Sequence, residues 1–247
     1  MTLRRSVDPN GVAEVVMEDA PGRNSLTPGF VDALMRELGA VAADETAKVL
    51  LLRGLPDVFC SGADRDTLIR LCRKEIRPVD IVLPKAVLDL PIPVIAAMEG
   101  HAVGGGFALG LCADIVLLAE DSRYGCSFMN MGFTPGMGIT RLMEHFMPPA
   151  VAVELQFTGT FHTGASFRGR SGFNAILPRA AVLNEARTMA AAIAEKPRQS
   201  LVLLKRYQSL ARRKAFEESH TVETMMHEIS LAQPDAAQQV FENFIHG

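Results

Sequence analysis

Three short runs of almost unbroken apolar sequence constrain the fold of this chain more than any other feature. They occupy Lys48–Arg53, Val94–Met98 and Ile115–Ala119. A strand with one wet face alternates apolar and polar residues, whereas an unbroken apolar run is typical of a strand covered on both faces. Helical patterns are predicted between these strands, at Thr67–Glu75 and Val79–Leu90. The alternation of strand and helix predicts right-handed βα units and a buried parallel sheet.

The two ends of the chain carry different patterns. At the N-terminus, Asn10-Gly11 separates the β-prone runs Leu3–Val7 and Val12–Glu18, which predicts a hairpin. Beyond residue 140 the patterns are helical apart from one short strand at Ile176–Leu177, and no linker marks a boundary. The helices predicted there are Thr140–Phe146, Ala150–Gln156, Ala181–Lys196, Arg198–Arg213, Phe216–Leu231 and Asp235–Ile245.

Composition excludes several classes of protein. The chain has 247 residues, of which 48% are hydrophobic and 21% charged, with a formal net charge of −3. These values are ordinary for a soluble globular protein and argue against a nucleic-acid binder, which usually carries a basic excess. The four cysteines form no CxxC pair, so no metal site is indicated. Without a signal peptide or an apolar run of about 18 residues, a cytoplasmic protein with no membrane partner is expected.

Two turns interrupt the strand–helix pattern in a way that chemistry would explain. Phe59–Asp64 follows the first apolar run, and Gly100–Gly106 follows the second. In open α/β sheets, ligands bind at the carboxyl ends of strands, and a helix that begins there presents unpaired N–H groups. Two such turns aimed at one point would form an oxyanion hole. Taken singly, however, each turn is more often a simple turn or a close packing contact, and neither a GxGxxG nor a GxxxxGK[ST] motif is present.

The two turns belong to longer segments with a recognisable pattern. The segments are FCSGAD (59–64), PIPVIAAMEGHAVGGGFAL (91–109), ADIVLLAE (113–120), MGFTPGMG (131–138) and KPRQSLVLLK (196–205). Together they resemble the crotonase (enoyl-CoA hydratase/isomerase) superfamily over essentially the whole chain. The resemblance implies an α/β fold, namely a ββα superhelix (spiral) core at 1–195 with a C-terminal helical trimerisation region at 196–247. It also implies a homotrimer or dimer of trimers, an acyl-thioester substrate, and an oxyanion hole formed by the amides of Ala63 and Gly105.

Two departures from the superfamily pattern argue against hydration. Hydratases of this superfamily hold and activate water with two glutamates, and by motif alignment these positions are Ala108 and Phe128 here. Neither side chain can take or give a proton, and hydration needs a positioned acid or base. The segments GADRDTLIRLCRKE (62–75) and MHEISLAQPD (226–235) are instead similar to the hydratase-like decarboxylases of polyketide β-branching cassettes. Those enzymes remove CO2 from a 3-methylglutaconyl group on an acyl carrier protein and give a 3-methylcrotonyl-type thioester.

Resemblance to this subgroup also suggests the remaining site residues. His227 matches the histidine of its C-terminal motif and is expected to supply the proton after CO2 leaves, although a helix histidine facing solvent is the ordinary alternative. His220 and His101 are weaker candidates. The subgroup carries a tyrosine and a lysine where this chain has Thr67 and Leu71. Either an apolar pocket drives decarboxylation by desolvation, which we favour, or the protein has lost activity and only binds acyl groups.

The sequence therefore predicts a lyase that needs no cofactor, with a substrate tethered through phosphopantetheine or CoA. An acyl carrier protein is the expected partner. The alternatives are an enoyl-CoA isomerase and a non-catalytic homologue that binds an acyl carrier protein. The residues expected to bind the substrate are Gly62, Asp64, Thr67, Leu71, Gly104 and Phe128.

Overall fold

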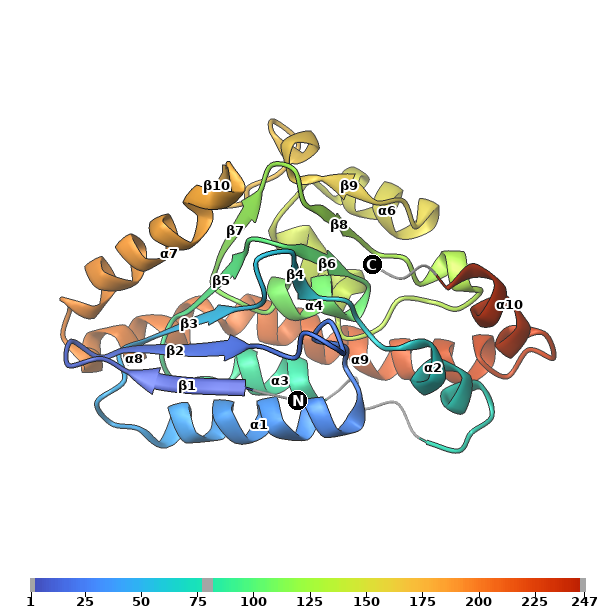
Figure 1. Ribbon diagram of the computed structural model, residues 1–247, viewed down its shortest axis with the longest axis horizontal. Helices are drawn as coiled ribbons and strands as arrows, with labels where there is room; N and C mark the ends of the chain where they lie inside the picture. Colours follow the sequence, from blue (N-terminus) through green and yellow to red (C-terminus); the bar gives the residue numbers. More distant parts are fainter. Residues whose placement is uncertain (1–2, 77–81, 245–247) are drawn as a thin grey trace.

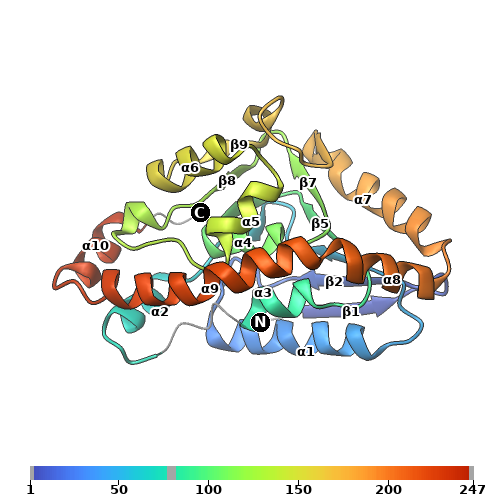
Figure 2. The same cartoon turned by 180° about the vertical axis from the view of Figure 1, so that it is seen from behind.

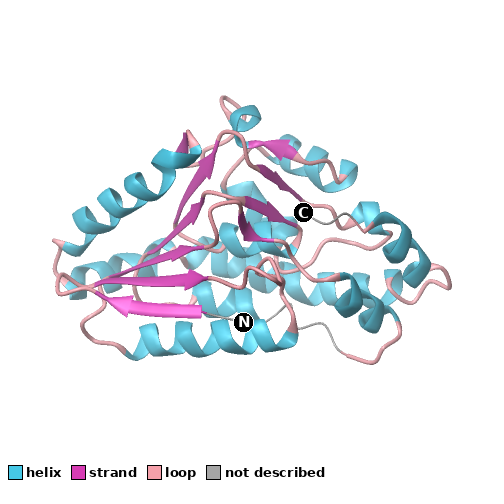
Figure 3. Cartoon of the chain, viewed as in Figure 1, coloured by secondary structure: helices cyan, strands magenta, loops and turns pink. Residues whose placement is uncertain are grey.

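The computed structural model describes residues 3–76 and 82–244. Within this part of the chain the strands form two sheets that run through the middle of the molecule, with helices around them (Figures 1 and 3). The larger sheet contains, in spatial order, β1 (Leu3–Val7), β2 (Val12–Met17), β3 (Val49–Arg53), β5 (Val94–Met98), β7 (Ile115–Ala119) and β10 (Ala175–Leu177). Only the β1–β2 hairpin is antiparallel among these pairs, as the sequence predicts.

The second sheet was not predicted. Its strands are, in spatial order, β4 (Val58–Cys60), β6 (His101–Val103), β8 (Arg123–Gly125) and β9 (His162–Thr163). Strands this short carry no measurable periodicity, so the sequence gives no signal for them. Each of the first three follows a strand of the larger sheet, which produces the ββα order implied by the resemblance.

Eight of the helices in the described part of the chain correspond to the predicted ranges, although not every boundary agrees. They are α1 (Pro28–Ala43), α2 (Arg65–Cys72), α3 (Val82–Leu88), α4 (Gly105–Leu111), α5 (Ile139–Leu142), α6 (Pro149–Thr158), α7 (Arg179–Ala194), α8 (Arg198–Gln208), α9 (Leu210–Ser230) and α10 (Ala236–Asn243), with 3-10 turns η1 (Met129–Met131), η2 (Met143–His145) and η3 (Gly164–Phe167). The predicted break between Arg213 and Phe216 is wrong, because the chain breaks at Ser209 and α9 continues through that region. Residues 79–81 of the helix predicted at Val79–Leu90, and Ile245, lie outside the described residues.

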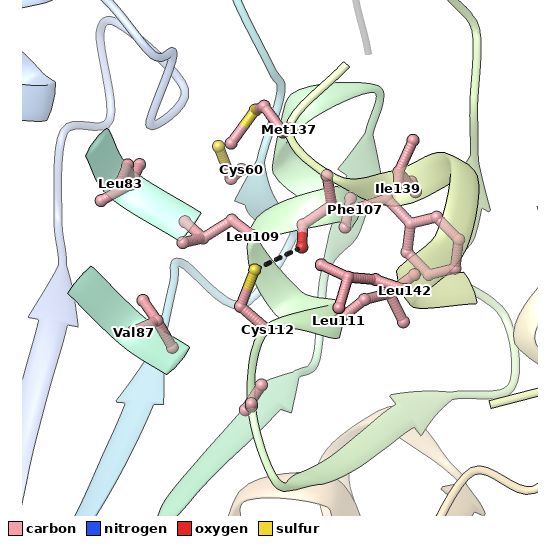
Figure 4. Packing of buried hydrophobic residues seen from close by; sticks show 14 of the residues in the cluster. Cys60, Leu83, Val87, Phe107, Leu109, Leu111, Cys112, Met137, Ile139 and Leu142 are labelled. Atoms are coloured by element: carbon pink, nitrogen blue, oxygen red, sulfur yellow. Dashed lines mark hydrogen bonds between the residues drawn. The ribbon is translucent and has the colours of Figure 1, made fainter. Parts of the chain in front are cut away.

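Helices cover both faces of the larger sheet, which explains the unbroken apolar runs. Val49, Leu51 and Ile95 face α7, whose contact stripe consists largely of small residues such as Ala186 and Ala190. The alternate residues of the same strands belong to a separate cluster that also includes residues of α1, α3 and α4. Figure 4 shows residues of α4 in this cluster between Leu83 and Val87 of α3 and Ile139 and Leu142 of α5.

A cluster of charged side chains with little exposure connects α8 and α9 to the larger sheet. Asp114, at the start of β7, accepts from the Lys205 ammonium at 2.6 Å and also pairs with Arg212. The same carboxylate accepts from the Val94 amide at 2.8 Å, so it satisfies groups on three elements. The cluster thus places α9, which crosses the molecule beside α5 (Figure 2). Among the described helices none is long and apolar enough to cross a membrane.

Candidate active site

The two glycine-rich turns follow strands of the smaller sheet. Ser61–Asp64 leaves the end of β4, and Gly104–Gly106 leaves the end of β6. The prediction that the turns directly follow the long strands β3 and β5 is therefore wrong. The short strand β4 lies between β3 and the first turn, and β6 lies between β5 and the second turn. Because β4 and β6 are parallel neighbours, their carboxyl ends lie side by side and bring the two turns together.

Glycine is required where these turns meet. Gly62 has φ +76° and Gly104 has φ +51°, a region that side chains with Cβ rarely adopt. A Cβ on Gly62 would lie only 2.7 Å from the Val103 carbonyl oxygen and 3.4 Å from the Gly105 nitrogen. The Gly62 turn therefore packs directly against the start of α4. This contact confirms that the two turns converge.

The amides of Ala63 and Gly105 are both available at this junction. Neither N–H donates to an acceptor among the described residues. Gly105 is the first residue of α4, where a helix leaves its N–H groups unpaired and carries partial positive charge. Both residues line a single pocket of about 370 Å³. The arrangement suits an oxygen that becomes negatively charged during a reaction.

The pocket is almost entirely apolar. Its walls include Leu26, Leu68, Leu83, Met131 and Met137, and no Asp, Glu, Lys or Arg is among the described residues that line it. Leucine and methionine side chains offer no hydrogen bond to a carboxylate, so a charged group in this space would lose most of its hydration.

Thr67, Leu71 and Phe128, which the sequence indicates as candidate substrate-binding residues, all line the pocket. Thr67 and Leu71 stand one turn apart on α2. Phe128 packs edge-on against Phe133, with ring centroids 5.9 Å apart. Ala108, the other position of the hydratase pattern, is fully buried inside α4 and does not line the pocket.

Asp64 caps a helix and does not line the pocket. Its Oδ1 accepts from the Thr67 amide at 2.6 Å and caps the N-terminus of α2. It does not line the pocket, so the prediction that Asp64 binds substrate is not supported by the geometry. The sequence suggested a ligand contact because Asp64 adjoins the oxyanion turn, but aspartate is also a preferred N-cap residue.

His227 lies in the pocket wall, and the alternative of a solvent-facing helix histidine is wrong. The residue is only 4% exposed. Its Nε2 donates to the Thr134 carbonyl oxygen at 2.6 Å, and its ring meets Phe133 edge-on at 5.8 Å. The hydrogen bond requires a proton on Nε2 and fixes the ring plane. His227 is also the only histidine, and the only ionisable side chain, among the described residues that line the pocket.

The weaker histidine candidates lie elsewhere. His220 packs on Phe216 with ring centroids 5.4 Å apart, and it does not line the pocket. His101 Nδ1 accepts from the Arg123 amide at 2.9 Å, which ties β6 to β8. Burial lowers the pKa of His101, so this ring favours its neutral form. Neither side chain lines the pocket.

The two lysines nearest to Leu71 in the sequence, Lys74 and Lys85, do not line the pocket. Lys74 is exposed and lies beyond the end of α2. Lys85 is exposed on α3, where its ammonium pairs with Asp89 at 2.7 Å. The apolar pocket therefore receives no cation from either residue.

Sequence reasoning missed Glu223, one turn before His227 on α9. The residue is 2% exposed, and its carboxylate accepts from the Gly138 amide at 2.6 Å and the Thr140 amide at 3.0 Å. Burial raises the pKa of Glu223, while the hydrogen bonds from Thr140 and Gly138 oppose that rise. Its spacing of four residues from His227 was the available signal. Glu223 and His227 therefore both form hydrogen bonds to the backbone of the segment around Met137.

Comparison with known proteins agrees with this geometry. The family model described as enoyl-CoA hydratase/isomerase matches residues 8–245. The bacillaene synthase decarboxylase PksI of Bacillus subtilis is 36% identical over 219 residues, covering 89% of this chain and 88% of that protein. The chain belongs to the enoyl-CoA hydratase/isomerase family and is an enzyme of the crotonase superfamily.

Solved structures extend the similarity to the whole fold. The ECH2 decarboxylase domain of CurF from Lyngbya majuscula is 35% identical, with a TM-score of 0.92, covering 98% of this chain and 99% of that domain. A structure from a dehydratase/decarboxylase enzyme couple involved in polyketide beta-branching is 33% identical, with a TM-score of 0.94 and coverage of 99% of each chain. These relatives share the arrangement of sheets and turns described above.

Proposed function

We propose that this protein is a lyase that decarboxylates a 3-methylglutaconyl-type thioester on an acyl carrier protein in polyketide β-branching. The product is a 3-methylcrotonyl-type thioester. The observation that carries the proposal is the convergence of the Ala63 and Gly105 amides on a pocket without a charged lining residue among those described. Similarity to two decarboxylases, each covering most of the chain, supports the same reaction.

The chemistry needs little more than this arrangement. The bond from the carboxyl group to its neighbouring carbon breaks, and its electron pair passes through the alkene to the thioester oxygen. The Ala63 and Gly105 amides stabilise the resulting dienolate. CO2 leaves, so no base is required. His227 then donates one proton to carbon, and the thioester carbonyl re-forms.

An apolar wall favours the charge migration. Leu71 and Phe128 line the pocket and offer no hydrogen bond to the substrate carboxylate. The ground state holds its charge among apolar groups, whereas the transition state moves that charge toward the two amides. With Ala108 and Phe128 at the glutamate positions, we propose that the enzyme does not hydrate alkenes. We further propose that it needs no cofactor and assembles as a homotrimer or a dimer of trimers.

Three substrates distinguish the proposed lyase from the alternatives. The purified enzyme is given a 3-methylglutaconyl carrier, crotonyl-CoA and an unbranched 3-enoyl-CoA, and the products are separated by chromatography. CO2 release from the first substrate alone is expected. Movement of the double bond in the third would favour an enoyl-CoA isomerase, and tight carrier binding without turnover would favour a non-catalytic homologue.

Leu71→Lys tests the role of the apolar wall. A lysine here would stabilise the carboxylate before reaction but not the dienolate, so KM and kcat are both expected to fall about tenfold. Steady-state kinetics with the carrier-bound substrate measure both constants, and Leu71→Met is the matched apolar control. A rise in kcat with Leu71→Lys would mean that the missing cation limits the enzyme, contrary to the desolvation account.

A further inference from the structure

Most polar side chains that line the pocket already have protein partners or face water. Asn243 is exposed, so its amide is hydrated. The buried or half-buried groups with partners are Ser61, which shares a hydrogen bond with Ser25, and His227, which donates to Thr134. Asn130 donates to the Gly159 carbonyl oxygen at 2.8 Å.

Ser127 differs from these residues. It is only 7% exposed, lines the pocket, and its hydroxyl makes no hydrogen bond to any residue that the structure describes. It lies two residues beyond the end of β8 and adjoins the oxyanion turn, since a Cβ on Gly104 would lie 3.5 Å from its Oγ. The Ser127 hydroxyl oxygen is not among the fully buried atoms that lack a partner, so it is open to the pocket and available to a ligand group.

The Thr67 hydroxyl also lines the pocket without a partner among the described residues. A threonine inside a helix, however, can turn its hydroxyl to a carbonyl of the preceding turn. Ser127 lies between β8 and η1, where no preceding helical turn offers such a carbonyl. Ser127 therefore lacks the helical carbonyl, one turn earlier, that the Thr67 hydroxyl has available.

We infer that the Ser127 hydroxyl donates a hydrogen bond to the terminal carboxylate of the substrate and positions the bond that breaks. The inference rests on the proposed function, because the 3-methylglutaconyl substrate carries a terminal carboxylate in addition to its thioester. The thioester oxygen takes the two amides, and the carboxylate then needs a donor in a pocket with no cation among its described lining residues.

A neutral hydroxyl suits this task better than a charged group. One hydrogen bond fixes the direction of the carboxylate, so that the bond to be broken can align with the π system of the alkene. It does not neutralise the carboxylate, and the apolar wall still disfavours the charged ground state. Ser127 would thus orient the carboxylate through one hydrogen bond, while Leu71 and Phe128 offer it none.

Two inert ligands isolate the role of Ser127. The pantetheine thioester of 3-methylglutaric acid keeps the carboxylate but lacks the alkene that accepts electrons, and isovaleryl-pantetheine lacks the carboxylate. Ser127→Ala is expected to weaken binding of the first ligand about tenfold to a hundredfold and to leave the second unchanged. Calorimetry measures both affinities, Ser127→Thr should retain most of the difference, and Thr67→Val is the comparison variant.

The outcomes separate the inference from the function. If wild-type enzyme releases CO2 while Ser127→Ala binds both ligands like wild type, Ser127 does not bind the carboxylate. Equal weakening of both ligands, or a selective loss in Thr67→Val alone, would also overturn the inference. If wild-type enzyme releases no CO2, the proposed function itself fails, whatever the binding results are.

Discussion

Replacing Gly105 with proline is expected to lower kcat for decarboxylation by about 10²–10³-fold. The reason is that proline removes one of the two N–H groups that we assign to the dienolate oxygen. Gly105 is the first residue of α4, a position that proline tolerates well because its N–H has no helical partner. The loss should therefore appear in catalysis while the fold is retained.

Gly105→Ala is the matched control because it adds a Cβ but keeps the N–H. That Cβ would meet only the ends of flexible side chains, Met137 Sδ at 2.8 Å and Leu26 Cδ1 at 2.9 Å. We expect similar melting temperatures for the two variants and a large difference in kcat between them. If the proline and alanine variants had equal kcat, the Gly105 amide would have no part in the reaction.

Removing the imidazole with His227→Ala is expected to lower product formation about 10²-fold or to change which alkene isomer is formed. A positioned proton donor contributes a factor of this size, and water would otherwise protonate either end of the dienolate. NMR of the released acyl group measures the isomer ratio, and a stopped assay measures the rate.

His220→Ala is the control on the same helix, since its ring packs on Phe216 and does not line the pocket. We expect that variant to keep the wild-type rate and isomer ratio. Full activity with an unchanged isomer ratio in His227→Ala would remove His227 from the mechanism.

The main strands could be predicted because strands buried on both faces appear in the sequence as unbroken apolar runs. β5 and β7 have the predicted boundaries, since helices cover both of their faces and every position favours apolar residues. The smaller sheet could not be predicted, because its strands of two or three residues show no pattern of their own. Its strands form through pairing with neighbours that are distant in the sequence.

The candidate site divides in the same way. The two glycine turns could be found because Gly62 and Gly104 require positive φ, and His227 was found through a family resemblance. Glu223 was missed although its spacing from His227 was a signal, because the loop that it binds is brought to it only by the fold. Ser127 could not be found, because only the fold places it beside Gly104. Oligomeric state and cellular location remain predictions from the sequence.

The mass of a loaded carrier protein tests the central claim most directly. A carrier bearing the 3-methylglutaconyl group is incubated with the purified enzyme and examined by intact-protein mass spectrometry over time. The account predicts that the carrier becomes lighter by the mass of one CO2, and that a carrier bearing the saturated 3-methylglutaryl group keeps its mass. An unchanged mass of the unsaturated carrier, or a gain of one water, would contradict it.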